Sequence, residues 1–261
     1  MISAELMGRL GNQMFIIAAA HSLAIDNNDK AVFLRHLTGI TPTDRERAIH
    51  QKTILRNVEY VDNLSFIQSV YHEPPDHSYQ KLVYKPNLFL KGYFQSEKYF
   101  TDNRKEILDL FSPIEQVNSF LQKKYSNLIN NHNFVSVHVR RGDYLKYSDY
   151  HAIMGKPYYD KAMKSFDKDC RFVFFSDDIE WCKETFPGAG NVFIENQDDV
   201  LDLYLMSKIP NNIIGNSSFS WWAAWLNENS DKRVVAPSLW FGPNNMHLDR
   251  SSLTPESWEI I

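Results

Sequence analysis

One pattern recurs along this chain: a short apolar run ends in a polar turn, and a helical pattern follows. The run over residues 134–137, Phe-Val-Ser-Val, has the β-branched and aromatic residues of a buried strand, and a polar turn over 138–143 follows it. Strands that alternate with helices predict parallel sheets. In such open sheets ligands bind beyond the carboxyl ends of the strands, so the polar turns are the candidate functional residues.

The turn over 138–143 reads His-Val-Arg-Arg-Gly-Asp and places Arg140 and Arg141 side by side beyond a strand end. Adjacent arginines in a partly buried position are unfavourable unless anionic groups face them. The planar fork of a guanidinium matches phosphate oxygens, so the turn predicts a phosphate-bearing ligand, in particular a nucleotide. The alternative is a solvated turn with an internal ion pair between arginine and aspartate, because such surface pairs contribute little.

A second turn, Gly8-Arg9-Leu10-Gly11-Asn12-Gln13, lies between a predicted strand over 2–7 and a predicted helix over 14–25. Its glycines let a ligand approach the backbone, and a helix N-terminus offers amide N–H groups to an anion. Neither the dinucleotide fingerprint nor the Walker loop matches this spacing, because Leu10 and Gln13 stand where glycines are needed and no Gly-Lys-Ser/Thr follows. A tight turn with a helix cap is the alternative.

Two more turns follow predicted strands over 172–176 and 212–215. In the later one Asn216, Ser217 and Ser218 precede a helical run, where they either cap the helix or present its N-terminus to an anion. In the earlier one Asp177 and Asp178 are placed to accept hydrogen bonds from a ribose or a base, to hold a metal, or to cap the next helix.

Composition limits the class of protein. The chain has 261 residues and a formal net charge of −4, which argues against general nucleic-acid binding. Its two cysteines, Cys170 and Cys182, are too few for a disulfide scaffold and are expected to be reduced. We expect no signal peptide, because the sequence opens on a strand, and no membrane span, because no apolar run approaches ~20 residues. A cytoplasmic location is therefore predicted.

Taken together, these segments resemble the α-1,2-fucosyltransferases of glycosyltransferase family 11 and, more widely, the superfamily with α-1,6- and protein O-fucosyltransferases. The matching stretches run through nearly the whole chain and are residues 8–15, 92–100, 137–144, 172–182 and 215–226. Eukaryotic members of the family carry an N-terminal membrane anchor and stem. Because the sequence shows neither, the chain is most similar to bacterial members, for which O-antigen or capsule assembly is a plausible setting.

The resemblance implies an α/β fold of GT-B type, in which two Rossmann-like domains face each other across a cleft. Residues 1–130 are expected to form the N-terminal acceptor-side domain and residues 131–261 the C-terminal domain that binds GDP-fucose, with the boundary in the polar stretch over 130–133. The segment over 44–86 has no clear pattern and is expected on the acceptor side. Helices are predicted over 96–111, 113–130, 157–168, 178–186, 198–208 and 217–228.

The implied activity is the inverting transfer of L-fucose from GDP-β-L-fucose to O2 of a terminal β-galactose in a glycan. The resemblance implies no metal and no cofactor. The expected catalytic residues are Arg140, which stabilises the leaving phosphate, and Asp143. The residues expected to bind substrate are Asn12 and Gln13 near the diphosphate and fucose, His138 and Asp177 at the guanosine, and Arg141, Asn216, Ser217, Ser218 and Phe219.

The general base stays open at the level of the sequence. Asp143 is the first candidate, and Asp149, His151 and Glu5 are the others. Two other functions also remain: a metal-dependent GT-A glycosyltransferase that uses Asp177 and Asp178 as its carboxylate pair, and a non-catalytic carbohydrate-binding module that uses tryptophans. The expected partners are GDP-fucose and a galactose-containing acceptor, with peripheral association at the inner face of the cytoplasmic membrane if that acceptor is lipid-linked.

Overall fold

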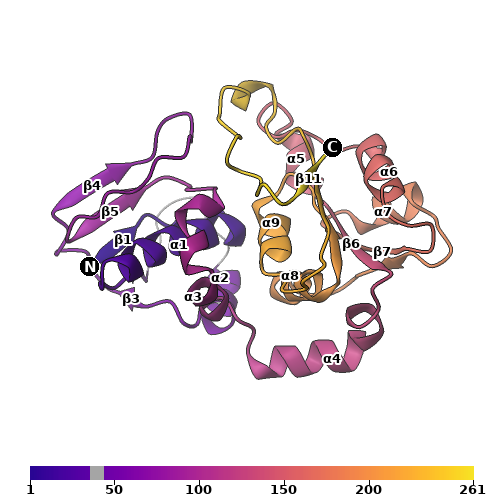
Figure 1. The fold of residues 1–261 in the computed structure, drawn as a ribbon, viewed down its shortest axis with the longest axis horizontal. Helices are drawn as coiled ribbons and strands as arrows, with labels where there is room; N and C mark the ends of the chain where they lie inside the picture. The colour runs from indigo at the N-terminus through magenta and orange to yellow at the C-terminus, as the bar shows by residue number, and fades with distance from the viewer. Residues whose placement is uncertain (36–43) are drawn as a thin grey trace. The chain divides into compact units, whose positions relative to one another are not determined.

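The computed structural model describes residues 1–35 and 44–261, which contacts within the chain divide into two compact units. The first unit comprises Met1–Ile114 and Leu248–Pro255, and the second comprises Glu115–His247 and Glu256–Ile261. Figure 1 traces the chain in colour from its N-terminus to its C-terminus. The predicted alternation of strands and helices is present in both units.

The first unit is built on parallel strands. One sheet contains β1 (Ile2–Ala4), β5 (Leu88–Lys91) and β4 (Ser69–His72), in the order β1-β5-β4. A second pair is formed by β2 (Phe33–Leu34) and β3 (Tyr60–Val61). Ala31 adds a parallel bridge to Ile2. The helical segments of its described residues are α1 (Leu10–Asp26), α2 (Asp44–Lys52), η1 (Glu97–Tyr99), η2 (Thr101–Asn103) and α3 (Arg104–Leu110).

Helix α1 is the core of the first unit. Its residues 14–20, Met-Phe-Ile-Ile-Ala-Ala-Ala, are completely inaccessible to solvent, which explains why they are apolar all round the helix. The helix begins at Leu10, earlier than predicted, so Asn12 and Gln13 lie in its first turn and not in a loop. Gly8, just before the helix, has φ +68°, a conformation that favours glycine.

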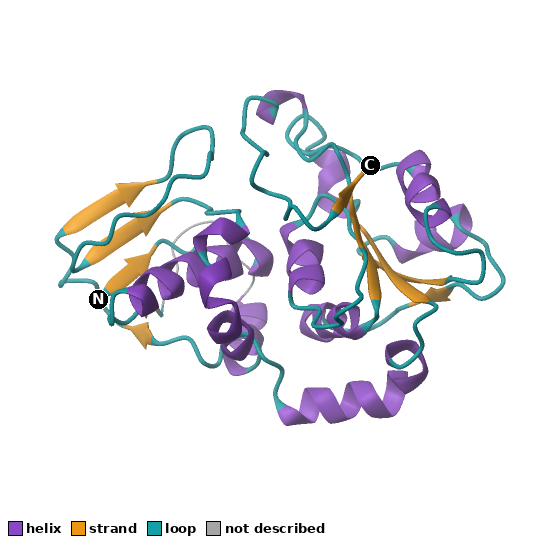
Figure 2. Ribbon diagram, in the orientation of Figure 1, coloured by secondary structure: helices purple, strands orange, loops and turns teal. Residues whose placement is uncertain are grey.

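The second unit is a parallel sheet of six strands in its described residues, with helices on both faces. Figures 1 and 2 show α8 (Asp199–Lys208) and α9 (Ser218–Trp225) on one face and α6 (Lys156–Lys164) and α7 (Ile179–Thr185) on the other. The strand order is β11-β10-β9-β6-β7-β8. The strands are β6 (Phe134–Val139), β7 (Arg171–Ser176), β8 (Val192–Phe193), β9 (Asn211–Ile213), β10 (Val234–Ala236) and β11 (Glu259–Ile260).

The centre of this sheet is β6, and each of its six residues is buried. A strand covered on both faces requires a nearly continuous apolar run, and in β6 only Ser136 and His138 interrupt it. Three elements of this unit escaped the sequence prediction: β11, the 3-10 helix η3 (Pro243–Asn245), and the short helix α5 (Gly142–Lys146), which starts directly after Arg141. The remaining helical segment among the described residues of this unit is α4 (Glu115–Ile129).

The division of the chain differs from the boundary expected at residue 130. Helix α4 belongs to the second unit, because it packs on α8, its Leu121 and Leu128 are buried, and the Tyr125 hydroxyl donates to Gln197 Oε1 at 2.8 Å. The polar stretch over 130–133 is thus the turn from α4 into β6. Residues 248–255 return to the first unit, where the Asp249 amide donates to the Asp76 carbonyl at 2.7 Å.

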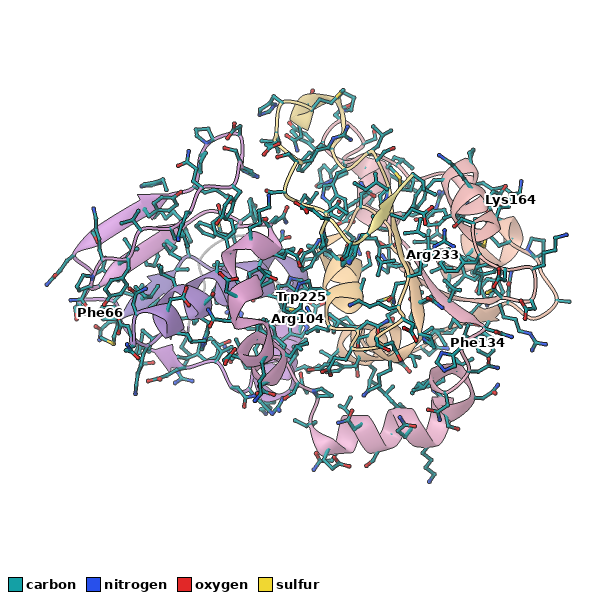
Figure 3. The ribbon with its side chains drawn as sticks, viewed as in Figure 1. Phe66, Arg104, Phe134, Lys164, Trp225 and Arg233 are labelled. Carbon is teal, nitrogen blue, oxygen red and sulfur yellow. The ribbon has the colours of Figure 1, made fainter. Side chains whose placement is uncertain are left out.

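Three tryptophans of α9 form a buried cluster with Trp258, which lies just before β11. Trp221, Trp222 and Trp225 are each at most 2% exposed, and the ring centroids of Trp221 and Trp258 lie 5.4 Å apart. Figure 3 labels Trp225 on this helix and Phe134 at the start of β6. Packed indole rings of this size contribute strongly to a core, so these residues have a structural role.

Asp202 in the first turn of α8 gives the second unit a pH-dependent stability. Its Oδ1 accepts a hydrogen bond from Gln197 Nε2 at 3.0 Å, and burial raises the pKa of its carboxyl to about 7. In the unfolded chain this pKa is about 4. The folded protein therefore holds the proton more tightly, and this stabilising contribution is lost as the pH rises from about 4 through 7.

We expect Asp202→Asn to remove this loss, because the amide stays neutral at every pH. At pH 8 the variant should raise the free energy of unfolding by roughly 1–4 kcal/mol over the wild type, whereas at pH 4 the two should be similar. Urea unfolding at both pH values measures the difference, with the exposed Asp167→Asn as the control. Equal pH dependence in wild type and Asp202→Asn would contradict the assignment.

Candidate functional site

The carboxyl ends of three neighbouring strands bring the predicted polar turns of the second unit together. β6 pairs with β7, with Val139 opposite Ser176, and with β9, with Val137 opposite Ile213. Because all three strands run in the same direction, the turns after Val139, Ser176 and Ile213 leave the sheet at one edge. This edge, with the turns 138–143, 176–178 and 214–219, is called the β6 edge below.

Arg140 is held between two carboxylates at the β6 edge. Its Nη2 lies 2.6 Å from Asp143 Oδ1, and its Nη1 lies 3.0 Å from Asp177 Oδ2. The guanidinium carbon also lies 5.5 Å from the centre of the Tyr144 ring. These contacts fix the plane of the guanidinium. One of its five N–H groups donates to Asp143, and others can donate to a further acceptor.

Arg141 is committed to the protein itself. Its guanidinium stacks 3.9 Å over the Trp181 ring, and its Nε lies 3.0 Å from Asp178 Oδ2. Its backbone amide donates to Asp177 Oδ1 at 2.8 Å. Asp177 therefore contacts both arginines, the amide of Arg141 and the guanidinium of Arg140. Asp178 also caps α7 by accepting from the Trp181 amide. Arg141 therefore positions Asp177 and α7.

His138 presents a neutral ring inside the β6 edge. The side chain is buried, and burial together with the charge of Arg140 lowers its pKa to about 3. Among the described residues its Nδ1 has no hydrogen-bond partner, which is rare for a buried polar atom. A Cβ on Gly215 would lie 3.7 Å from this Nδ1 and 3.2 Å from the His138 carbonyl oxygen. The glycine thus keeps the space beside the ring open.

The turn after β9 leads into α9. The Ser217 Oγ accepts from the Phe219 amide at 3.3 Å and caps the helix, whose first residue is Ser218. The Phe219 ring lies 5.6 Å from the His138 ring. Asn216 takes a role that the sequence did not suggest, because its Nδ2 donates to the carbonyls of Ala152 and Trp240, both at 2.8 Å. Asn216 therefore braces two loops.

Tyr144 is a site residue that the sequence reasoning missed. Its hydroxyl donates to the Asn216 carbonyl at 3.0 Å, and its ring stacks on His151 at 4.1 Å. Burial lowers the pKa of His151, so this imidazole is neutral near pH 7. The available signal was position: Tyr144 follows Asp143 within the same motif. Trp181 beneath Arg141 carried no comparable signal, because its partner lies 40 residues earlier in the chain.

Asn12 and Gln13 belong to the first unit, whereas the residues of the β6 edge belong to the second. The Gln13 Nε2 donates to the Gly8 carbonyl at 2.9 Å and closes the turn before α1. Asn12 Oδ1 accepts from Gln95 Nε2 at 2.9 Å. Of the proposed bases, Glu5 pairs loosely with Lys91 at 3.9 Å, and Asp143 is occupied by Arg140.

The geometry bears on the two alternative functions. The described residues contain no group of three or more histidine, cysteine or acidic side chains that could hold a metal ion, and both Asp177 and Asp178 face guanidinium groups. A carbohydrate-binding module needs exposed rings. Five of the six tryptophans are buried, and the sixth, Trp181, lies beneath Arg141.

Comparison with known proteins identifies the family. Residues 1–258 match the family described as Glycosyl transferase family 11. The chain belongs to this family. The match spans the turn before α1 as well as the whole β6 edge, so it includes every candidate site residue, and the resemblance noted from the sequence is confirmed.

Three relatives, two of them from Escherichia coli, show how much of the chain the similarity covers. The O-antigen biosynthesis glycosyltransferase WbnK is 37% identical over 68% of this chain, which spans 62% of that protein. An alpha-1,2-colitosyltransferase is 30% identical over 100% of this chain and 98% of its own length. A galactoside alpha-(1,2)-fucosyltransferase 1 from Rattus norvegicus is 29% identical over 84% of this chain and 61% of its own length.

Solved structures confirm the predicted GT-B fold. The fucosyltransferase NodZ from Bradyrhizobium superposes with a TM-score of 0.55 at 11% identity, covering 85% of this chain and 91% of NodZ. POFUT1 in complex with GDP-fucose gives a TM-score of 0.53 at 13% identity, covering 90% of this chain and 97% of POFUT1.

Within the described residues, no helix combines the length and the apolar character that a membrane crossing requires.

Proposed function

We propose that this chain transfers L-fucose from GDP-β-L-fucose to O2 of a terminal β-galactose in an acceptor glycan, with inversion at the anomeric carbon. The observation that carries the proposal is the fixed guanidinium of Arg140, held between Asp143 and Asp177 at the carboxyl edge of a parallel sheet in a family 11 chain. A positioned cation at such an edge suits a leaving diphosphate.

The reaction breaks the bond between C1 of fucose and the β-phosphate oxygen, and the electron pair stays on that oxygen. The acceptor oxygen forms the new bond to C1 from the opposite face and releases its proton. Arg140 stabilises the charge that grows on the phosphate, because its spare N–H groups donate where that charge develops. Ser217 and Ser218 place the N-terminus of α9 toward the same anion.

The other side chains of the β6 edge serve donor binding. The neutral His138 ring offers its unpartnered Nδ1 to the guanosine part, with Phe219 as an apolar wall beside it. Asp177 is assigned to guanosine through the family pattern and also holds Arg140. Arg141 and Asn216 position these groups. Asn12 and Gln13 are assigned to the diphosphate and fucose.

Asp143 has a positioning role in this proposal. Its carboxylate Oδ1 lies 2.6 Å from Arg140 Nη2, so it helps to fix the guanidinium that faces the leaving phosphate. To take the acceptor proton it must first part from Arg140. His151, stacked on Tyr144 and neutral near pH 7, is an alternative proton acceptor next to it.

A second donor is supported by one observation. A relative that matches this chain from end to end is a colitosyltransferase, and colitose is L-fucose without the hydroxyl at C3. A site that hydrogen-bonds this hydroxyl discriminates strongly against the sugar that lacks it, whereas a site that leaves the hydroxyl uncontacted accepts both. GDP-colitose is therefore the alternative donor.

Incubation of the protein with GDP-fucose or GDP-colitose and a panel of β-galactosides, followed by NMR of the product, tests the proposal. We expect fucosyl transfer, an α-configured C1 and a linkage to O2 of galactose. Transfer of colitose alone would replace the donor assignment.

We further propose that the enzyme acts in the cytoplasm, and at the inner face of the membrane where its acceptor is lipid-linked.

Arg140→Ala is expected to lower kcat by at least ~100-fold, since one electrostatic donor at a reacting centre contributes about that much. Arg140→Lys should recover only part of the loss, because a point charge cannot reproduce the planar fork. Steady-state kinetics with GDP-fucose measures both. The control is Lys156→Ala, which removes the half-exposed ion pair between Lys156 and Asp160 on α6. Near-normal turnover of the alanine variant would refute the leaving-group assignment.

Activity should survive excess EDTA, because Arg140 and the N-terminus of α9 supply the positive potential that a divalent ion otherwise provides. Initial rates before and after chelation, and again with added Mn²⁺, measure the effect. A loss of activity that Mn²⁺ restores would favour the metal-dependent alternative with Asp177 and Asp178.

A further inference from the structure

The segment over 92–100, Gly-Tyr-Phe-Gln-Ser-Glu-Lys-Tyr-Phe, carries part of the family pattern but has no role in the mechanism above. It forms a tight turn after β5, in which Gly92 has φ +153° and Phe94 has φ +51°. A non-glycine residue in this left-handed region is strained and persists only when its surroundings enforce it. Something must therefore hold the turn.

Glu73 holds it. This residue follows β4, whose pairing with β5 sets His72 opposite Lys91, so that Glu73 comes beside Gly92. Its two carboxylate oxygens accept from the Tyr93 and Phe94 amides, each at 2.7 Å. The side chain is only 9% exposed, and a Cβ on Gly92 would lie 2.3 Å from the Glu73 Cβ. Glu73 and Gly92 therefore require one another.

The next residue, Gln95, reaches Asn12 in the first turn of α1. Gln95 Nε2 donates to Asn12 Oδ1 at 2.9 Å, which uses the oxygen of the Asn12 amide. The nitrogen of that amide, Asn12 Nδ2, lies close to Gly8, because a Cβ on Gly8 would lie only 2.5 Å from it. Only a glycine at position 8 leaves room for Nδ2 in this orientation.

We propose that Gln95 is a positioning residue that fixes the amide of Asn12 with its N–H donors turned toward the donor sugar, and that Glu73 holds Gln95 in place. An unrestrained asparagine amide presents either its oxygen or its nitrogen with similar ease. Sugar hydroxyls and phosphate oxygens differ in this respect, because a phosphate oxygen only accepts. A fixed amide nitrogen therefore recognises the fucosyl phosphate end of the donor. This inference rests on the proposed function, which assigns Asn12 to that end.

The sharpest test is Gln95→Glu, which keeps the size and shape of the side chain but replaces the donor by an acceptor. The Asn12 amide then turns its nitrogen toward residue 95 and its oxygen outward. We expect kcat with GDP-fucose to fall by roughly 10-fold or more, in the range of one lost hydrogen bond to a charged group, while Gln95→Ala falls less. GMP binding by calorimetry should stay unchanged, because GMP lacks both the β-phosphate and the sugar. Gln68→Glu, an exposed glutamine of the same unit, is the matched control.

A double-mutant cycle with Asn12→Ala separates positioning from general damage. If Gln95 acts through Asn12, the variant carrying both Asn12→Ala and Gln95→Glu transfers no more slowly than Asn12→Ala alone. If the double variant instead lost kcat by the product of the two single losses, the proposal would be overturned. A Gln95→Glu variant with normal kcat would overturn it as well. Glu73→Gln, which sets an amide N–H group against a backbone N–H group, should reproduce the loss in kcat with GMP affinity retained.

The side-chain amide resonances of ¹⁵N-labelled protein test the contact without any turnover. The Asn12 amide signal should shift in Gln95→Glu and stay in place in Gln68→Glu; an unshifted signal would overturn the pairing. Normal transfer by Asn12→Ala, with that shift present, would instead refute the assignment of Asn12 in the proposed function. Wild-type protein that transfers colitose and no fucose would change the donor, and the same cycle then applies with GDP-colitose.

Discussion

The parallel pairing of β6 with β7 and β9 is the constraint on which the rest of the second unit depends. The register that sets Val139 opposite Ser176 makes the two strands end together, and β9 ends beside them. Three turns that are distant in the sequence therefore emerge at one edge. Burial on both faces of β6 fixes this register, because the helices cover an apolar strand that cannot slide without exposing part of itself.

Charge at this edge is balanced within the protein. Two arginines face three aspartates, and each guanidinium is also stacked on or near an aromatic ring. Leaving a buried charge without a partner costs several kcal/mol, so the aspartates let the arginines stay in place before any ligand arrives. Preorganisation of this kind is what an electrostatic catalyst requires, because the donors need no rearrangement when charge develops.

The first unit applies the same arrangement with different chemistry. The strands β1, β5 and β4 are also parallel, and the turns after them carry Gly8, Gly92 and Glu73. In this unit the side chains fix the conformation of the backbone, whereas at the β6 edge they balance charge. A buried carboxylate holds two successive amides, and two glycines make room for Glu73 and Asn12. Burial raises the pKa of Glu73, while the two backbone hydrogen bonds oppose that shift and favour its ionised form.

The sequence by itself determined the strand ends and the chemistry placed there, because apolar runs and polar turns are local patterns. It predicted the α/β alternation correctly for this reason, and it placed Arg140 directly after a strand, where the structure also has it. What it did not determine depends on contacts between distant segments: α4 joins the second unit through α8, Arg141 stacks on Trp181, and Asn216 braces loops around Ala152 and Trp240. Only the tertiary structure decides such roles, since the partner of a polar side chain is set by strand register and helix packing.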